Sequence, residues 1–384
     1  MNDRIETYKV KIANYLNADP GNIFLHWKGR VSLYSILKSM NVGKGDEVIL
    51  PGYTCVVVPN AIMYLGAKPV YVDIEKGSFN MDYNQIEGKI TKKTKVIICQ
   101  NTYGLSTDVE KIVKLAKKYK LYTIEDCTHG FGGSYNGKPN GSYCDAAFYS
   151  TQWNKPFSTG IGGFALITNP VLLDGMYEIK KQLIVPSFMD QLVLKVLLFT
   201  KRYILSDLLY WPMIYTYRWL SKKNLILGSS SGGEISGNLM PYDYLKGISM
   251  TQVNEGLSTL ARFDELQDLR KKNSDKYTLL LKENKKIYVH EIWNKNHSFL
   301  KYTILVKNRE NFIKLAEKNR ISLGDWFTSP LHPARESDLV IWNYKMKNFP
   351  VAVEVAKCAV NLPTDTKYID KTLDFVRNNL DEIY

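Results

Sequence analysis

The sequence has little of what marks exported or metal-binding proteins. Its five cysteines are an odd number, widely spaced and without a CxxC pair, which argues against a disulfide framework or a zinc site. They are Cys55, Cys99, Cys127, Cys144 and Cys358. The first residues, MNDRIETYKVKIANYL, are charged and have no uninterrupted apolar core of the kind a signal peptide needs. We therefore expect a cytoplasmic protein that binds no metal.

A long uncharged apolar run is also missing. Residues 185–225 are apolar and aromatic, but charges interrupt them, and a membrane-spanning helix needs about 20 nearly uncharged residues. The interrupting residues are Lys195, Lys201, Arg202 and Asp207. Two interpretations stay open: helices packed on the body or on a second subunit, or a basic amphipathic segment resting on a membrane surface. Residues 228–238, GSSSGGEISGN, are typical of a flexible loop.

Charge is unbalanced toward the positive. The 51 Lys+Arg against 38 Asp+Glu give a formal charge of +13, which favours anionic partners. Nucleic acid, an acidic membrane, and small phosphorylated or carboxylated ligands are the three classes. Because no basic cluster interleaved with aromatics and no helix-turn-helix pattern is visible, we expect no nucleic-acid partner.

Residues 30–170 alternate helical and strand patterns, which predicts an α/β fold with a mostly parallel sheet and helices on both faces. In such sheets ligands lie beyond the carboxyl ends of the strands. The expected strands are 47–50, 69–73, 95–99, 121–125 and 145–150, and the expected helices are 31–40, 61–65 and 109–119.

A second α+β unit is expected toward the C-terminus. Its elements are a helix at 251–271, a strand at 302–306 and a closing helix at 367–379. At 384 residues the chain has room for a large domain and a smaller companion. We therefore predict a large domain at 20–245, a small C-terminal domain at 246–384, and a helix at 1–19 packed against the body.

The residues with most chemical potential lie between Thr123 and Phe164. One predicted strand ends in Glu125-Asp126, with His129 three residues later, and the next ends at Ser150, ahead of Lys155. A parallel sheet would gather this acid, histidine and lysine at one edge.

These blocks resemble the DegT/DnrJ/EryC1/StrS family of sugar aminotransferases, which have the pyridoxal-phosphate-dependent transferase fold type I. The resemblance is carried by Glu125-Asp126-Cys127-Thr128-His129, by Ser150 five residues ahead of Lys155, and by the glycine-rich STGIGG that follows. Further similar blocks are 45–75, NTYG at 101–104 and 349–364. Several blocks in the right order are more specific than any one of them.

The resemblance implies that Lys155 carries pyridoxal 5'-phosphate as a Schiff base and later moves a proton as a free amine. Asp126 would face the pyridine nitrogen and keep it protonated, and His129 would stack on the ring. The cofactor-binding set is Asp126, His129, Ser150, Gly29, Arg30, Cys55 and Gln152. Each has a structural alternative: a surface lysine for Lys155, a helix cap for Asp126, a core residue for His129.

The phosphate needs a helix N-terminus, and the helix beginning near Gly29 and Arg30 offers one. Most of the family has Ser-Gly-Thr where this chain has Lys28-Gly29-Arg30. Arg30 would bind the phosphate in place of the threonine hydroxyl, or point away into a surface ion pair. Cys55 stands where many relatives have a stacked aromatic ring. No Asn-x-Arg segment precedes Gln252, so the contact usually made by a neighbouring subunit is in doubt.

Substrate recognition is expected from the aromatic loop Leu323–Pro333 (LGDWFTSPLHP) of the second domain, which in relatives closes over the sugar. A purely structural loop is the alternative. The candidate substrate-binding residues are Trp27, Tyr103, Asp325, Trp326 and His332.

The implied reaction moves an amino group from glutamate, through pyridoxamine 5'-phosphate, to a keto sugar that is normally nucleotide-linked. Products of such enzymes build surface polysaccharide, lipopolysaccharide or glycosylated antibiotics. A free keto-acid sugar, such as an oxidised octulosonate, is the alternative substrate, and a regulator that binds the cofactor without turnover is the alternative function. A dehydratase of the same fold would have histidine at Lys155. Active sites shared between two subunits imply a homodimer.

Overall fold

The computed structural model describes residues 2–204, 239–290 and 295–384. At its centre is a seven-stranded sheet in which only β10 runs antiparallel to its neighbours. In spatial order the strands are β1 (Ile23–His26), β10 (Gly163–Ile167), β9 (Ala146–Ser150), β6 (Tyr122–Asp126), β5 (Thr94–Gln100), β2 (Glu47–Pro51) and β4 (Lys68–Val72). The α/β fold with a mostly parallel sheet is confirmed.

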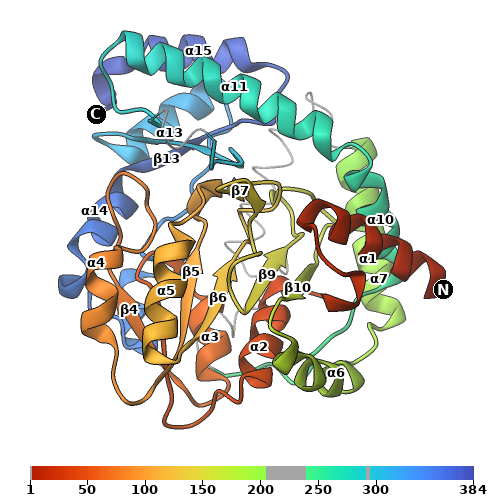
Figure 1. Cartoon of the computed structure of the whole chain (residues 1–384). Helices are drawn as coiled ribbons and strands as arrows, with labels where there is room; N and C mark the ends of the chain where they lie inside the picture. Colours follow the sequence, from red (N-terminus) through yellow and green to blue (C-terminus); the bar gives the residue numbers. More distant parts are fainter. Residues whose placement is uncertain (1, 205–238, 291–294) are drawn as a thin grey trace.

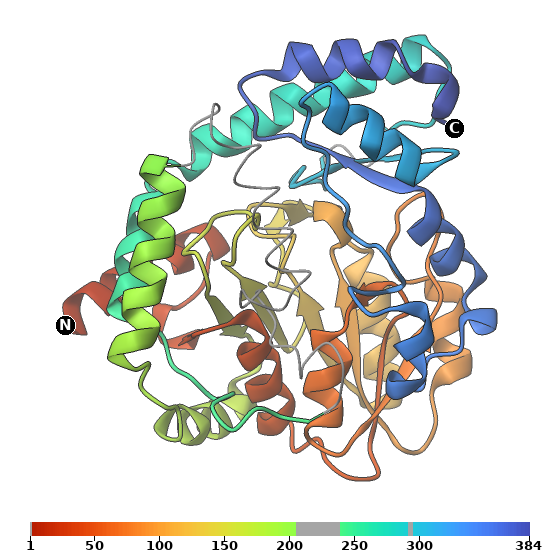
Figure 2. The ribbon, with the colours of Figure 1, turned by 180° about the vertical axis from the view of Figure 1, so that it is seen from behind.

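Helices cover both faces of this sheet because its strands are apolar on both sides. On β5, Val96 and Ile98 join one core cluster, whereas Ile97 and Cys99 join another. The first cluster includes the helices α2 (Gly29–Ser39), α3 (Val57–Met63) and α6 (Leu173–Lys181), and the second includes α5 (Val109–Tyr119). Figure 1 shows α5 in front of the sheet, and Figure 2 shows α2 and α3 from behind.

The predicted helix at 251–271 is interrupted. The structure has α10 (Met250–Leu260) and then α11 (Phe263–Glu283), because Arg262 leaves helical geometry between them. α10 packs against the N-terminal helix α1 (Asn2–Leu16), while α11 continues into the upper layer of Figure 1. The buried Phe263 anchors the turn between the two helices.

The upper layer in Figure 1 has its own core. Two antiparallel strands, β11 (Tyr302–Leu305) and β13 (Ala359–Leu362), contribute to it together with α11, α13 (Arg309–Lys318) and α15 (Ile369–Arg377). The segment between α13 and β13 instead packs into the core of the large sheet.

Two anchors hold that segment to the large sheet. The indole of Trp342 donates to Asn60 Oδ1 at 2.6 Å, and the carboxylate of Asp73 accepts the first N–H groups of α14 (Pro350–Cys358). A carboxylate at a helix N-terminus satisfies amides that have no partner within the helix. The division into domains at residue 245 stays a prediction.

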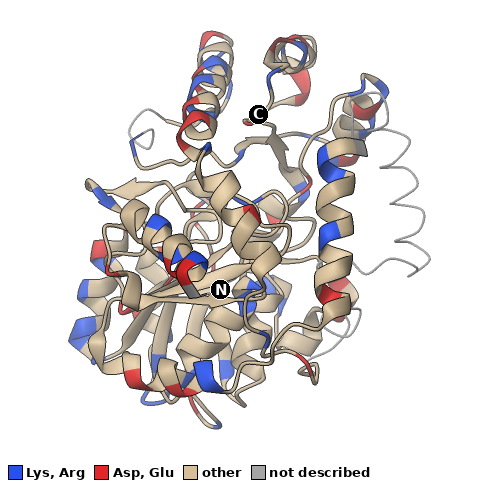
Figure 3. Ribbon diagram, turned by 90° about the vertical axis from the view of Figure 1, so that its right-hand side faces the viewer, with Lys and Arg blue, Asp and Glu red and all other residues tan. Residues whose placement is uncertain are grey.

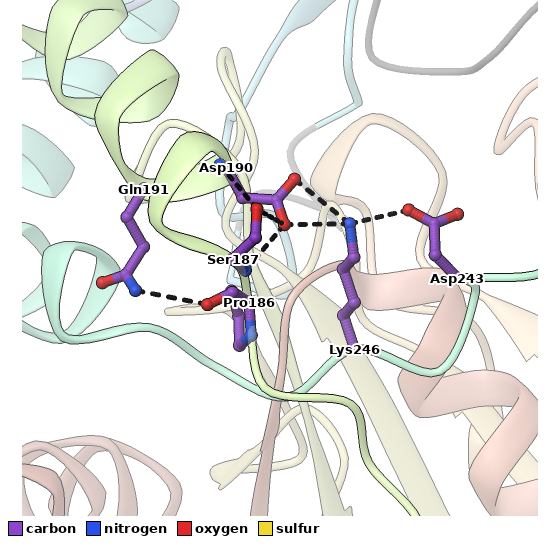
Figure 4. Close-up of polar contacts among 6 residues, drawn as sticks. All are labelled: Pro186, Ser187, Asp190, Gln191, Asp243 and Lys246. Carbon is purple, nitrogen blue, oxygen red and sulfur yellow. Dashed lines mark hydrogen bonds and ion pairs between the residues drawn. The ribbon is translucent and has the colours of Figure 1, made fainter.

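Helix α7 (Phe188–Phe199) lies in residues 185–204, the described part of the apolar segment 185–225. It begins with a capping box formed by Ser187 and Asp190, and Lys246 ties its start to the chain before α10 by ion pairs to Asp190 and Asp243 (Figure 4). The rest of the segment, from residue 205, and the loop predicted at 228–238 lie outside the described residues.

The outer face of α7 is apolar and open to solvent: Phe188 is 79% and Val196 55% exposed, whereas Leu194 is buried. On the side of the molecule that Figure 3 shows, basic and acidic residues lie intermixed over the helices. Among the described residues, no helix is both long and apolar enough to cross a membrane.

Candidate functional site

The sheet brings the acid and the lysine of the sequence motif to one edge. β6 and β9 are parallel neighbours with Asp126 opposite Phe148, so Asp126 and Ser150 both lie at the carboxyl ends of adjacent strands. The loop after Ser150 turns tightly: the backbone N–H of Lys155 donates to Gln152 O at 3.2 Å. The hydroxyls of Thr151 and Thr159, 2.7 Å apart, tie the two ends of this loop together.

Asp126 and Lys155 are close enough to influence each other's protonation. Burial lowers the pKa of Lys155 to about 8, against the charges of Asp126 and Cys55, which act to raise it. Burial raises the pKa of Asp126, while the Thr128 backbone N–H, at 2.9 Å, and the charge of Lys155 act to lower it. An amine with a lowered pKa is partly neutral near physiological pH and is therefore a competent nucleophile.

His129 is a buried neutral ring. Its Nδ1 accepts the backbone N–H of Tyr103 at 3.2 Å, which leaves the proton on Nε2, and burial holds its pKa well below the usual range. The indole of Trp326 lies parallel to it, with ring centroids 4.9 Å apart and planes 7° apart. Lys155 Nζ lies 4.6 Å from the centre of the same indole.

This arrangement suits a flat aromatic ring with a basic amine beside it. The stacked indole shows that the face of His129 accepts a planar ring within reach of Lys155, and Asp126 supplies a buried carboxylate near the same amine. The residues present therefore fit the pyridine ring that the resemblance implies, at the position that the Trp326 indole occupies in this structure.

The start of α2 lies against the end of β9. A Cβ on Gly29 would stand 2.8 Å from the carbonyl oxygen of Tyr149 and 3.1 Å from Ser150 Cβ, so only glycine allows this approach. The first N–H groups of a helix and its dipole favour an anion. Arg30 is buried, at 8% exposure, and its charge acts to lower the pKa of Cys55.

Three further candidates, Cys55, Tyr103 and Trp27, come from the part of the chain that forms the large sheet. Cys55 is influenced by the charges of both Lys155 and Asp126, so it lies near the centre of the site. Tyr103 is buried, and its hydroxyl donates to the backbone carbonyl of Trp326 at 2.9 Å. The backbone carbonyl of Trp27 accepts a hydrogen bond from the side-chain amide of Gln252 at 3.1 Å. Gln252 also donates to Ile161 O and so joins the residue after β1 to the loop that carries Lys155.

The loop 323–333 contributes unequally. Trp326 reaches the centre of the site, whereas the side chain of Asp325 is exposed. His332 Nδ1 accepts the backbone N–H of Thr328 at 3.2 Å, and burial lowers its pKa to about 4, with Lys155 among the charges that act on it. Arg309 holds the loop by donating to the carbonyl oxygens of Asp325 and Phe327.

Sequence reasoning missed two basic residues beside the site. Lys301 Nζ lies 5.8 Å from the centre of the Trp326 indole, and Arg270 donates to the carbonyl of Pro156, the residue after Lys155. The signal for Lys301 was its place directly before the predicted strand at 302–306. Arg270 had no signal, since it is one of several charged residues within a helix.

Comparisons with known proteins agree with one another. The model of the DegT/DnrJ/EryC1/StrS aminotransferase family matches residues 24–202 and 248–381. GDP-perosamine synthase of Escherichia coli O157:H7 is 27% identical over 359 residues, covering 93% of this chain and 84% of that protein. UDP-2-acetamido-2-deoxy-3-oxo-D-glucuronate aminotransferase of Pseudomonas aeruginosa is 40% identical over 141 residues, or 37% of this chain and 39% of the relative.

A solved structure from Streptococcus pneumoniae, in its PMP form, has a TM-score of 0.74 and 22% identity, and the match covers 98% of this chain and 90% of that one. The same protein was also solved in a PLP form. At this identity the likeness establishes the fold.

Proposed function

The chain belongs to the DegT/DnrJ/EryC1/StrS aminotransferase family, and from that premise we propose that it uses pyridoxal phosphate to move the amino group of glutamate to a nucleotide-linked keto sugar. The observation that supports the proposal is that Lys155 Nζ and the His129 ring both lie against the indole of Trp326, while the charge of Asp126, at the carboxyl end of β6, acts on Lys155. A lysine at 155 also separates the chain from the dehydratase branch, which the resemblance associates with histidine.

Pyridoxal phosphate, when bound, supplies an electron sink for the carbon that loses its proton. Lys155 binds the cofactor and, as a free amine, takes and returns that proton; a pKa near 8 allows both states near neutral pH. Asp126 holds a proton on the pyridine nitrogen, and the neutral His129 supports the ring by stacking. The N-terminus of α2, with Ser150 and Arg30, binds the phosphate.

The substrate class rests on the relatives. Curated relatives are named for GDP-linked, UDP-linked and dTDP-linked sugars, so the proposed acceptor is a nucleotide-linked keto sugar. An amino sugar formed in this way would serve surface polysaccharide or lipopolysaccharide synthesis. A cytoplasmic homodimer with shared active sites completes the proposal.

The first test is an absorbance spectrum of the purified protein before and after addition of glutamate. We expect a band of bound cofactor that glutamate converts to the spectrum of the pyridoxamine form. Lys155→Ala removes the attachment point and should lose the band. Lys181→Ala, which removes an exposed lysine paired with Glu178, is the matched control and should keep it. A colourless protein that takes up no added pyridoxal phosphate would disprove the proposal.

A second experiment identifies the acceptor. Protein converted by glutamate and freed of excess donor is mixed with GDP-, UDP- and dTDP-linked 3-keto or 4-keto sugars. Return of the original spectrum with one of them, and an aminated product by mass spectrometry, identifies the substrate. If only a free keto-acid sugar restores the spectrum, the nucleotide-linked assignment is wrong and the aminotransferase assignment stands.

A further inference from the structure

A second amine lies beside the Lys155 site and has no assigned role. Lys301 directly precedes β11, and its Nζ lies 5.8 Å from the indole centre of Trp326, the same ring that lies 4.6 Å from Lys155 Nζ. The side chain is partly buried, and its amine has no hydrogen-bond partner among the described residues. Burial lowers its pKa, and Arg270 adds to this effect.

Arg270, whose charge acts on this amine, has unused hydrogen-bonding capacity. It is 2% exposed, and one nitrogen, Nη1, donates to Pro156 O and to Gln267 Oε1, both at 2.9 Å. Its Nε is buried and has no partner within the described part of the chain. Lys201 adds a third positive charge near the loop of Lys155, with its Nζ 4.8 Å from the ring centre of Trp153.

One carboxylate, that of Asp365, interacts electrostatically with all three cations. Desolvation acts to raise the pKa of Asp365, but the charges of Lys301, Arg270 and Lys201 outweigh it and lower the pKa. Within the residues that the structure describes, none of these three cations forms an ion pair with Asp365 or with another carboxylate. Charged groups inside a protein are costly unless they are paired, so the excess of positive charge favours an anionic ligand.

We propose that Lys301, supported by Arg270, forms an oxyanion-binding subsite next to Lys155 that takes a carboxylate of the substrate. The inference rests on the proposed function, because the subsite adds to the site around Lys155 a second group that recognises the substrate. The cofactor phosphate is assigned to the start of α2, so the anion at Lys301 is a different one. Two substrates could supply the carboxylate: the glutamate donor, or an acidic keto sugar.

Calorimetric titration of the pyridoxal-phosphate-loaded protein tests the subsite, with glutarate standing for the donor carboxylates and D-glucuronate for a sugar acid. Lys301→Met keeps the length of the side chain and removes its charge. Loss of a hydrogen bond to a charged group predicts affinity weaker by about tenfold or more. Lys301→Arg should restore part of the loss. Lys307→Met, at an exposed lysine just beyond β11, is the matched control and should bind as the wild type does.

The two probes separate the sources. Weaker binding of glutarate alone assigns the subsite to the donor, and weaker binding of glucuronate alone assigns it to the sugar. The inference is overturned if the wild type binds neither probe, or if Lys301→Met binds both unchanged. The cofactor spectrum of each sample reports separately on the proposed function, because a missing band in the wild type contradicts that function whatever the titrations give.

Discussion

The two halves of the site were assembled by different means. Asp126, Ser150 and Lys155 lie within 30 residues of one another and are placed by the pairing of two adjacent strands. Arg270, Lys301 and Trp326 come from three separate segments, and only tertiary packing brings them to the neighbourhood of Lys155. The chemical half is therefore local in sequence, whereas the half proposed to recognise the substrate depends on long-range contacts.

The largest effect that would sharpen this comparison is expected from Asp126→Asn. Loss of the buried charge that is proposed to face the cofactor should slow conversion by glutamate on the order of 10²–10³-fold, the scale found when one preorganised electrostatic group is removed. Bound cofactor should remain visible in the spectrum. Stopped-flow absorbance measures the rate. Asp325→Asn is the control in the other half, because its side chain is exposed; an equal loss in both variants would break the comparison.

An intermediate effect is expected from pH. Because the pKa of Lys155 is lowered to about 8, its neutral, reactive fraction rises with pH and levels off above that value. Capture of added pyridoxal phosphate by the cofactor-free protein should therefore speed up about tenfold from pH 7 to 9 and then change little, whereas an ordinary lysine levels off only above about pH 10.4.

Asp126→Asn provides the internal check on this profile. The charge of Asp126 acts to raise the pKa of Lys155, so its removal should move the midpoint to lower pH. An unchanged midpoint would mean that Asp126 and Lys155 do not interact electrostatically.

The smallest effect is expected from the loop that carries Trp326. Arg309→Met removes the hydrogen bonds that the guanidinium donates to the carbonyl oxygens of Asp325, Phe327 and Ala356. Because the site is partly exposed, water can replace some of these hydrogen bonds. We expect the free energy of unfolding to fall by about 1 kcal/mol, measured by urea denaturation. Arg377→Met, at an exposed pair with Asp374, should change it by less than about 0.5 kcal/mol. An unaltered Arg309→Met variant would show that the loop needs no clamp.

Most strands of the large sheet could be predicted from the sequence, whereas the break between α10 and α11 and the different positions of the loop residues could not. Strand patterns predicted β4, β5, β6 and β9 to within a residue or two, because each is a short apolar run bounded by turns or helices. The break between α10 and α11 was not predicted, since helical periodicity continues through it and the turn is set by the burial of Phe263. Trp326 and Asp325 were equal candidates in the sequence, and only the structure distinguishes the stacked indole from the exposed carboxylate.

The sequence by itself determined the fold class, the family and the order of acid, histidine and lysine along the chain, because these depend on residue type at short spacing. Tertiary structure alone decided that Arg309 holds the loop of Trp326 against the site, and that Lys301 and Arg270 lie beside Lys155. It also decided the lowered pKa of Lys155, which comes from burial. The physical reason is that burial and charge proximity depend on contacts between segments far apart in sequence, and no local pattern encodes them.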